Sequence, residues 1–402
     1  MTKPCSSVGA ASGEGLVALF PPDVTASLMR RALFLAESNL GATSPNPSVG
    51  AVIADRETGE IIASAVTAQG GRPHAEAQAL AKAGSRALGA IMVVTLEPCS
   101  HFGATPPCAH AIAEAGIAAV IYGSRDPDMR VSGRGLTWLS EHGVAVMQGP
   151  FAREADWLNL GHALRVTARR PFVQIKLAVD AHGRVPKGAG GRPQWVTGDA
   201  ARAQAHLLRA RADAILVGRK TVEADDPELT CRLPGLDERS PIRVVLAPRG
   251  DLPYEARLFN AERPPTWIVC GVSPKCGRLF GRSNVRFFDI GVSSSGVLNL
   301  QLAMNRLAAE GVTRLLVEGG PSTSRRFLDA QLADEIVIMQ SDKSLEHEGS
   351  LPAFVDRGLD IVTESPSFAL TERRKAGADA ILIFRSTAHW QKLEPAPLIH
   401  QT

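Results

Sequence analysis

The chain has 402 residues, of which 45% are hydrophobic and 21% are charged, and its formal net charge is +3. This length predicts two domains, and a composition in the ordinary globular range excludes a fibrous or wholly disordered protein. The small net charge, together with the lack of a long basic run or of an apolar stretch of about 18 residues, argues against nucleic-acid and membrane partners.

Residues 1–22 are mostly small or polar and predict a flexible leader. They lack a basic segment followed by a continuous apolar one, so no signal peptide is expected. The chain has 6 cysteines, which are few for this length and argue against a disulfide scaffold. A reducing cytoplasm is therefore expected, where thiolates are free to bind metal.

The first half predicts alternating strands and helices. A helix is expected over 23–39, and "PNPSVGAVIA" predicts a loop that leads into a strand. "GAIMVVTLEPC" predicts a buried strand, "PCAHAIAEAG" a helix and "IAAVIYGS" another strand. Such alternation indicates a mostly parallel sheet with helices on its faces.

The pattern restarts near residues 166–172, and we place a domain boundary at about residue 169. A second α/β unit is expected, with strands in "PFVQIKLAVD", "AILVG", "IRVVLA", "TWIVCG" and "RLLVEGG". Helices are expected in "DAARAQAHLLRARAD" and "LNLQLAMNRLAAEG". The tail, residues 387–402, is expected to be disordered.

"RPHAEAQAL" opens a predicted helix with His74 and Glu76. Side chains two residues apart on a helix do not share a face, so a joint role requires partners from elsewhere in the chain. Cys99 follows a predicted strand, and Cys108 opens a predicted helix, where a thiolate is favoured over a thiol. One His and two Cys provide three zinc ligands and leave a fourth position for water, as in catalytic zinc sites.

In this interpretation Glu76 is not a ligand but the acid–base group, which takes a proton from water and passes it to a leaving amine. The H-x-E and P-C pattern is that of zinc deaminases, although here eight residues separate the cysteines instead of two. Two alternatives stay open. A single His or Cys is more often a packing residue, and a structural zinc would need a fourth ligand, for which His101 and His110 are available.

A resemblance follows from "PNPSVG", "HAE", "TLEPCSHFGATPPC" and "DPDMRVSGRG". Together these segments resemble the deaminase half of the bifunctional riboflavin-biosynthesis enzymes, which deaminate a diaminopyrimidinone that carries a ribosylamine 5-phosphate. The resemblance implies a cytidine-deaminase-like α/β/α fold. It also implies substrate contacts from Asn46, Ser48 and His101.

In the second half, "PFVQIKLAVDAHGR", "PQWVTG", "LLRARADAILVGRKTVEADDPELTCR" and "LLVEGGPS" resemble the reductase half of the same family. This resemblance implies a dihydrofolate-reductase-like α/β fold and NADPH. It implies that Lys176 is catalytic. The implied cofactor-binding residues are Ala178, Trp195, Thr221, Asp225, Gly320, Pro321, Ser322 and Thr323. The implied substrate-binding residues are Pro193, Arg209, Leu229, Arg232 and Glu318.

Physical chemistry is consistent with these roles but less specific. "EGGPSTSRRFL" is a Gly-rich turn into a helix, and the helix-start amides of residues 320–323 suit a phosphate group. A guanidinium such as that of Arg209 or Arg232 binds two phosphate oxygens at once. Taken alone, the turn would more often be a structural loop, each Arg a surface charge and Trp195 a core residue.

Four positions depart from the usual pattern of the reductase half, namely Asp180, His182, Pro193 and Ala247. They leave open an alternative in which the second domain is inactive and serves binding or assembly. A second rival, a nucleic-acid base deaminase, would need a basic stripe with aromatic residues for stacking. Aromatic residues make up only 5% of the chain, and no basic cluster lies near the zinc motif.

We therefore expect a cytoplasmic bifunctional enzyme that binds zinc and NADPH and acts on a small pyrimidine ribotide. The expected organisation is a leader (1–22), a zinc deaminase domain (23–168), a reductase domain (169–386) and a tail (387–402). The sequence leaves homo-oligomer formation open.

Overall fold

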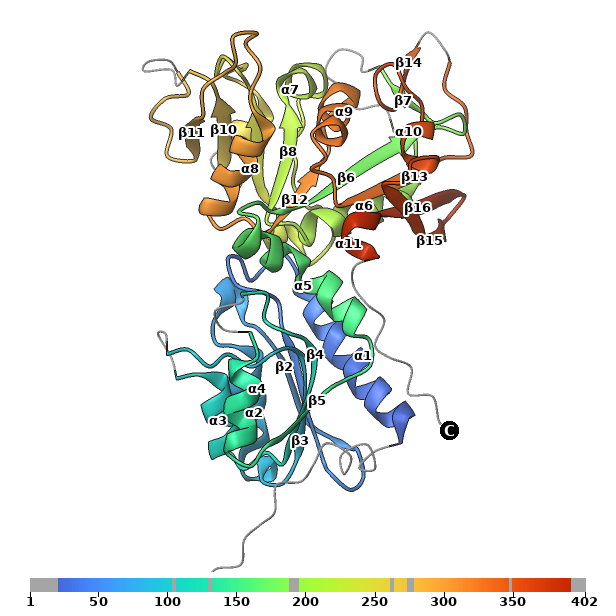
Figure 1. The fold of residues 1–402 in the computed structure, drawn as a ribbon. Helices are drawn as coiled ribbons and strands as arrows, with labels where there is room; N and C mark the ends of the chain where they lie inside the picture. The colour runs from blue at the N-terminus through green and yellow to red at the C-terminus, as the bar shows by residue number, and fades with distance from the viewer. Residues whose placement is uncertain are drawn as a thin grey trace, which may run out of the picture. The chain divides into compact units, whose positions relative to one another are not determined.

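The computed structural model describes residues 21–102, 106–128, 132–187, 195–260, 264–272, 278–346 and 349–391. Two compact units make up this part of the chain (Figure 1). The first contains residues 21–39 and 46–163, and the second contains residues 40–45 and 164–391. The chain passes from one unit to the other within α5 (Ala152–Thr167). No helix in these described ranges is both long enough and apolar enough to cross a membrane.

The first unit has a five-stranded sheet in the order β2-β1-β3-β4-β5. Its strands are β1 (Gly50–Ala54), β2 (Ile61–Val66), β3 (Ile91–Leu96), β4 (Ala119–Ser124) and β5 (Ala145–Gln148). β1 pairs antiparallel with both β2 and β3, whereas β3, β4 and β5 are parallel. The expectation of a mostly parallel sheet is therefore wrong for this unit. The reason is that β2, which the sequence analysis did not identify, returns directly from β1 as a hairpin.

Helices cover both faces of this sheet. α1 (Pro22–Ser38) lies on one face, and α2 (Ala75–Ala83), α3 (Cys108–Glu114) and α4 (Arg134–Glu141) lie on the other. Because successive side chains of a strand point to opposite faces, Met92 and Val94 pack with α2 to α4, while Ile91 and Val93 pack with α1. This sandwiching explains why every residue of β3 is buried.

The second unit has a nine-stranded sheet in the order β11-β10-β9-β8-β12-β6-β13-β16-β15. All neighbours from β11 to β13 are parallel, as expected, and β16 and β15 extend the sheet antiparallel. The strands are β6 (Phe172–Val179), β8 (Ala214–Gly218), β9 (Ile242–Leu246), β10 (Thr266–Cys270), β11 (Val285–Asp289), β12 (Arg314–Val317), β13 (Glu335–Gln340), β15 (Phe368–Ala376) and β16 (Asp379–Ser386). A separate pair joins β7 (Arg184–Pro186) to β14 (Ser350–Pro352).

The helices of this unit also divide between the two faces. α8 (Leu300–Ala309) and α9 (Pro321–Asp329) pack against Ile175 and Leu177 of β6. α6 (Asp199–Ala210) packs against Val337 and Met339 of β13 on the opposite face. The shorter helices are α7 (Arg219–Asp225), α10 (Asp360–Thr363) and α11 (Thr387–Trp390).

α11 corrects one expectation, because it forms within the stretch predicted as a disordered tail. His389 Nε2 lies 3.3 Å from Asp334 Oδ1, and the Arg385 guanidinium lies 4.2 Å from the centre of the Trp390 ring. These contacts hold residues 387–390 at β16. Residues 392–402 lie outside the described ranges.

Candidate active sites

The first candidate site joins three segments of the first unit. His74 is the N-cap of α2, Cys99 follows β3, and Cys108 is the first residue of α3. Their ligand atoms all lie within 4.8 Å of one another. His74 Nδ1 is 3.3 Å from Cys108 Sγ and 3.7 Å from Cys99 Sγ. The sequence-predicted group of metal ligands therefore meets in one place.

The position of His74 explains its spacing from Glu76. His74 has extended backbone angles (φ −67°, ψ 158°), so it precedes the helix and is not bound by the helical i, i+2 geometry. Glu76 lies in the first turn of α2, and only 4% of its surface is exposed. Burial, reinforced by the charge on Cys99, raises the pKa of the Glu76 carboxyl to about 7. A carboxyl with this pKa can both accept and release a proton near neutral pH.

A hydrogen bond between the two cysteines moves their pKa values in opposite directions. The hydrogen bond from Cys108 is the largest cause that lowers the pKa of Cys99, to about 4, and His74 adds to it. The backbone N–H of Cys108 also donates to Cys99 Sγ over 3.3 Å, as expected at the start of a helix. The hydrogen bond to Cys99, followed by burial, raises the pKa of Cys108. Both hydrogen bonds to Cys99 Sγ therefore favour the thiolate form of Cys99.

This donor set fits zinc, a borderline-soft ion that prefers imidazole and thiolate ligands. Among the described residues, neither His101 nor His110 joins the group. The side chain of His101 is exposed, and His110 stacks on the ring of Trp138 with centroids 3.9 Å apart. The alternative of a closed structural zinc therefore finds no fourth His or Cys ligand in the ranges that the structure covers.

The three predicted substrate residues of this unit differ in their surroundings. Asn46 Nδ2 donates to the carbonyl of Gly71 over 3.2 Å, near the segment that leads to His74. Ser48 is buried, and its hydroxyl donates to the carbonyl of Ala36 in α1 over 2.7 Å. His101 is exposed, two residues after Cys99. Of the three, His101 is the one with an exposed side chain, whereas Asn46 and Ser48 each donate to a backbone carbonyl.

The second candidate site is a cluster of buried charges in the second unit. Glu318, which follows β12, accepts two hydrogen bonds from Arg209 of α6, at 2.8 and 2.9 Å. Lys176 Nζ of β6 lies 3.9 Å from Glu318 Oε2. Burial opposes ionisation of Glu318, but Arg209 and Lys176 outweigh it and hold the pKa of Glu318 at about 2. Burial lowers the pKa of Lys176, which makes its ammonium group a better proton donor.

Arg209 also anchors the loop that carries Arg232. Arg209 Nη1 donates to the carbonyl of Thr230 over 3.0 Å, and the backbone N–H of Arg232 donates to His206 Nδ1 over 3.2 Å. Leu229 is buried with a left-handed backbone (φ 56°). The Arg232 guanidinium is 42% exposed and lies 3.8 Å from Glu228. Arg232 is therefore the more accessible of the two predicted phosphate-binding arginines.

The predicted cofactor residues meet at the start of α9. Gly320 is its N-cap and Pro321 its first residue, and the backbone N–H of Gly320 donates to Thr221 Oγ1 over 3.3 Å. A Cβ atom at Gly218 would lie 2.7 Å from Thr323 Oγ1, and one at Gly319 would lie 2.5 Å from Thr323 Cβ. Glycine at these two positions is therefore what lets β8, the turn and α9 approach closely.

The remaining predicted cofactor residues come from other elements of the second unit, and Ser322 follows Pro321 in α9. Ala178 is on β6, and Ser322 is exposed in the first turn of α9. Asp225 ends α7, and burial raises the pKa of its carboxyl. Trp195 is 59% exposed, with the Arg202 guanidinium 5.1 Å from the centre of its ring, so the expectation that a lone Trp is a core residue is wrong here. Pro193 lies outside the described residues.

The structure gives two of the four departures a physical role. Asp180 is fully buried, and its carboxylate accepts the backbone N–H groups of His182, Arg184 and Leu345 at 2.8–2.9 Å. It thereby shapes the turn between β6 and β7. Ala247 is buried at the end of β9, where its N–H donates to the carbonyl of Val269. The His182 side chain is exposed.

Two residues of these sites escaped the sequence analysis. His206 lies beside Arg209 and Arg232, and burial followed by these two charges lowers its pKa to about 4. Glu97 is buried, and it lies between the end of β3 and Cys99 in the sequence. Glu97 has a sequence signal, since it directly precedes the Pro-Cys pair. His206 has none beyond its place one turn before Arg209.

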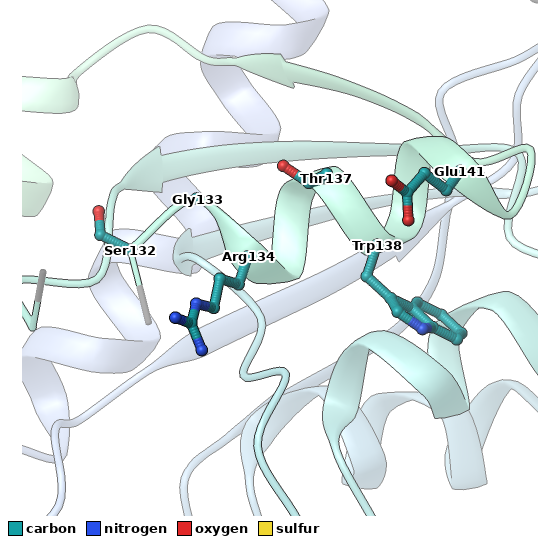
Figure 2. Close-up of a pocket in the computed structure, with 6 residues that line it drawn as sticks. All are labelled: Ser132, Gly133, Arg134, Thr137, Trp138 and Glu141. Atoms are coloured by element: carbon teal, nitrogen blue, oxygen red, sulfur yellow. The ribbon is translucent and has the colours of Figure 1, made fainter. Parts of the chain in front are cut away.

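A surface hollow of the first unit contains none of the predicted ligands of the first site. Figure 2 shows it along α4, with the Arg134 and Trp138 side chains projecting from the helix. Its lining residues are Ser132, Gly133, Arg134, Thr137, Trp138 and Glu141. Both faces of the Trp138 ring are covered, by His110 at 3.9 Å and by His142 at 3.7 Å between centroids, so this ring is not free to stack on a ligand.

Comparison with known proteins covers both units. Residues 23–124 match the family described as the cytidine and deoxycytidylate deaminase zinc-binding region. Residues 171–350 match the RibD C-terminal domain. Over 363 residues the chain is 34% identical to riboflavin biosynthesis protein RibD of Aquifex aeolicus (strain VF5), covering 90% of this chain and 99% of that protein. The Escherichia coli (strain K12) RibD is 37% identical over 369 residues, covering 88% of this chain and 97% of that protein.

Solved structures agree. RibD of Acinetobacter baumannii superimposes with a TM-score of 0.78 at 31% identity, covering 91% of this chain and 100% of that one. A Thermotoga maritima diaminohydroxyphosphoribosylaminopyrimidine deaminase/5-amino-6-(5-phosphoribosylamino)uracil reductase has a TM-score of 0.78 at 32% identity, covering 91% and 99%. These similarities confirm the expected fold class, a cytidine-deaminase-like α/β/α unit followed by a dihydrofolate-reductase-like α/β unit.

Proposed function

This chain belongs to the RibD family of riboflavin biosynthesis proteins, and from that premise we propose which of its residues catalyse the two family reactions and on what substrate. The protein is a bifunctional enzyme of riboflavin biosynthesis with a zinc-binding deaminase unit and a reductase unit. No observation favours the alternative in which the second unit is inactive.

We propose that His74, Cys99 and Cys108 hold the zinc ion and that the first unit deaminates a diaminopyrimidinone ribosylamine 5′-phosphate. Zinc, when bound, supplies a Lewis acid that makes water nucleophilic at neutral pH. Glu76 accepts a proton from the attacking water and donates one to the departing amine, so that the ring carbon exchanges its amino group for an oxo group and ammonia leaves. Asn46 and His101 contact the pyrimidine.

The observation that carries this proposal is the meeting of the His–Cys–Cys cluster with a buried carboxyl. The three ligand atoms lie within 4.8 Å, and Glu76, two residues from His74, has a pKa of about 7. A structural metal site has no use for such a carboxyl, which costs free energy to bury.

For the second unit we propose reduction of the ribosyl group, in its opened imine form, to ribityl, with NADPH as the nicotinamide cofactor. The cofactor supplies a hydride to the imine carbon, and Lys176 donates the proton that the nitrogen requires. Glu318 and Arg209 hold Lys176 in place, and Arg232 with Leu229 binds the substrate phosphate end. The turn and first residues of α9 (320–323), with Thr221 and Asp225, hold the cofactor. Ala178 and Trp195 flank the nicotinamide.

We propose further that the partners are small molecules and that the enzyme works in the cytoplasm. The net charge of +3 and the small share of aromatic residues support a metabolite rather than a nucleic-acid substrate. The sparse cysteines, two of which are proposed metal ligands, suit a reducing compartment.

Incubation of the purified protein with the diaminopyrimidinone ribotide tests both reactions. Without NADPH, mass spectrometry should find the amino-to-oxo product alone. With NADPH, it should find the product that carries two further hydrogens. The ribotide recovered unchanged would contradict the deaminase proposal, and a deaminated product unaffected by NADPH or by NADH would contradict the reductase proposal.

A further inference from the structure

A buried carboxylate beside the metal site has no part in the chemistry proposed above. Glu97 follows β3, and only 4% of its surface is exposed. Its oxygens accept three backbone hydrogen bonds. Oε2 accepts the N–H groups of Asp126 at 3.2 Å and Gly133 at 3.0 Å, and Oε1 accepts that of Gly135 at 3.1 Å. A charge-assisted bond is about twice as strong as a neutral one, so these three are a strong tie.

The three donors come from one connection, the segment between β4 and α4. Asp126 lies just after β4, Gly133 is the N-cap of α4, and Gly135 is in its first turn. Both described ends of this connection are therefore bound to the same side chain. The Glu97 backbone N–H also donates to the carbonyl of Ser124, over 2.8 Å, at the end of β4.

The same connection packs directly against the proposed metal loop. A Cβ atom added at Gly135 would lie 2.0 Å from the carbonyl oxygen of Pro98, the residue before Cys99. That distance excludes any larger residue without movement of the backbone. The start of α4 thus touches the peptide that precedes a proposed zinc ligand. Glu97 binds the backbone on the α4 side of this contact.

Asp126, one of the residues whose backbone binds Glu97, carries a carboxylate that interacts with the charge of Cys99. Asp126 is half-buried; burial, followed by the charges of Asp128 and Cys99, raises the pKa of its carboxyl, while the charge of His101 opposes this. The Asp126 carboxylate in turn accepts the N–H of Asp128 over 2.8 Å. The Glu97 carboxylate therefore holds the backbone of a residue whose charge interacts with that of Cys99.

We infer that Glu97 is a positioning residue for deamination: its carboxylate holds Asp126 and the start of α4 beside Cys99, where the substrate binds. The inference rests on the proposed deaminase function. We expect Glu97 to act through substrate binding rather than through the metal or the proton transfer, because the three bonds described above come from backbone groups of Asp126, Gly133 and Gly135.

Glu97→Gln tests this in the full-length zinc-loaded enzyme. The amide has one acceptor oxygen instead of two, and its NH2 group would face backbone N–H donors. We expect full zinc content and a deaminase KM raised about tenfold or more, with kcat changed less than KM, since one lost charge-assisted bond corresponds to at least this factor. Reductase activity on the deaminated intermediate should be unchanged, which gives an internal control.

Gly135→Ala disturbs the same contact from the other side, with the Glu97 carboxylate itself unchanged. Its Cβ must displace the start of α4 from Pro98, so it should reproduce the raised KM. Glu141→Gln, at the exposed far end of α4, is the matched control and should leave both activities unchanged. Equal KM values for Glu97→Gln and the unchanged enzyme would overturn the inference, as would loss of zinc from Glu97→Gln.

A readout without substrate separates this inference from the proposed function. Hydrogen–deuterium exchange of the amides of Asp126, Gly133 and Gly135 should accelerate in Glu97→Gln while exchange in β3 and β4 stays slow. Unchanged exchange overturns the positioning role even if the enzyme deaminates the ribotide. Failure of the unchanged enzyme to deaminate, with accelerated exchange in the variant, would refute the proposed reaction and leave the structural tie standing.

Discussion

At Glu76 a single residue has to serve two proton transfers, and burial is what suits it to both. The carboxyl is 4% exposed and its pKa lies at about 7, so neither its charged nor its neutral form is strongly disfavoured near neutral pH. Glu76 is not among the three predicted ligands. Its chemistry and the retention of metal should therefore separate on mutation.

Glu76→Gln should keep about one zinc per chain and lose deamination. A positioned acid–base group contributes roughly 10²–10⁴-fold in rate, and the loss should lie at or beyond the upper end because one group handles both transfers. Metal analysis and deaminase assays check this, with reductase activity as the internal control. Cys99→Ser is the contrasting variant and should lose zinc and deamination together. Release of zinc by Glu76→Gln would contradict the assignment.

Glu318 matters to stability as well as to the proposed reduction. Its pKa of about 2 lies below the ordinary value of 4.5, so its ionised form stabilises the folded state at pH values above the ordinary pKa. This contribution is lost as the pH falls from about 4.5 toward 2. In Glu318→Gln the cations of Arg209 and Lys176 stay buried without their counter-charge.

Removing one partner of a buried ion pair typically costs about 3–5 kcal/mol. At pH 7 the free energy of unfolding of the second unit, measured with urea, should therefore be lower by about this amount in Glu318→Gln than in the unchanged protein. The difference from the unchanged protein should shrink toward pH 3. A difference that stays constant or grows as the pH falls would show that the Glu318 charge is not what stabilises the cluster.

At the scale of elements, a substitution in the turn between β12 and α9 can test cofactor binding without disturbing the packing of the fold. A Cβ atom at Gly320 would meet only Thr221 Oγ1, at 3.8 Å, which is an ordinary contact. Gly320 also has φ −65°, which any residue can adopt. A side chain at this position would therefore leave the fold intact and obstruct only a ligand that approaches the backbone.

Gly320→Ala should weaken NADPH binding about tenfold and leave the melting temperature unchanged. Titration of the full-length protein with NADPH, followed by nucleotide fluorescence, measures the change. Arg232→Ala is the matched control: it should leave NADPH affinity unchanged and weaken substrate binding by about 1.5–3 kcal/mol, the scale of a hydrogen bond to a charged group. Equal NADPH affinity for Gly320→Ala and the unchanged protein would place the cofactor phosphates elsewhere.

The elements also show where sequence patterns predict well. Helix α1 and strands β1, β3, β4, β6, β8, β9, β10 and β12 appear where apolar runs or helical spacing indicated them. β15 did not, because its sequence "FALTERRKA" is rich in charged residues and only its last residue is buried, as is common at the edge of a sheet. β13 is an apolar run, "EIVIMQ", which the expected element order omitted.

At the scale of the whole molecule, the chain has two compact units, each with its own candidate site. The metal cluster lies in residues 46–163, and the buried charge cluster lies in residues 164–391. No residue proposed for one reaction comes from the other unit. The two activities should therefore be separable in different copies of the protein.

A mixture of Glu76→Gln and Lys176→Met proteins should convert the ribotide to the reduced product in the presence of NADPH, although neither variant does so alone. The first variant lacks deamination and the second lacks the proposed proton donor of the reductase. Product analysis by mass spectrometry, with each variant alone as the control, checks this. Accumulation of the deaminated intermediate in the mixture would mean that it does not pass between copies.

The sequence by itself determined what depends on residues close along the chain. The His74 and Glu76 pair, the cysteines at a strand end and a helix start, and the Gly-rich turn before α9 each carry their chemistry in a local pattern. Local patterns do not show which residues that are distant in the sequence come into contact. Only the tertiary structure decided that Arg209 is buried against Glu318 rather than lying at the surface.

The tertiary structure also decided that the first sheet is half antiparallel, since hairpin pairing depends on where β2 returns and not on its composition. It likewise decided the role of Glu97, whose three partners lie 29 to 38 residues further along the chain. Backbone N–H groups have no sequence signature, because every residue except proline carries one. The pairing of a carboxylate with such backbone groups therefore cannot be predicted until the chain is folded.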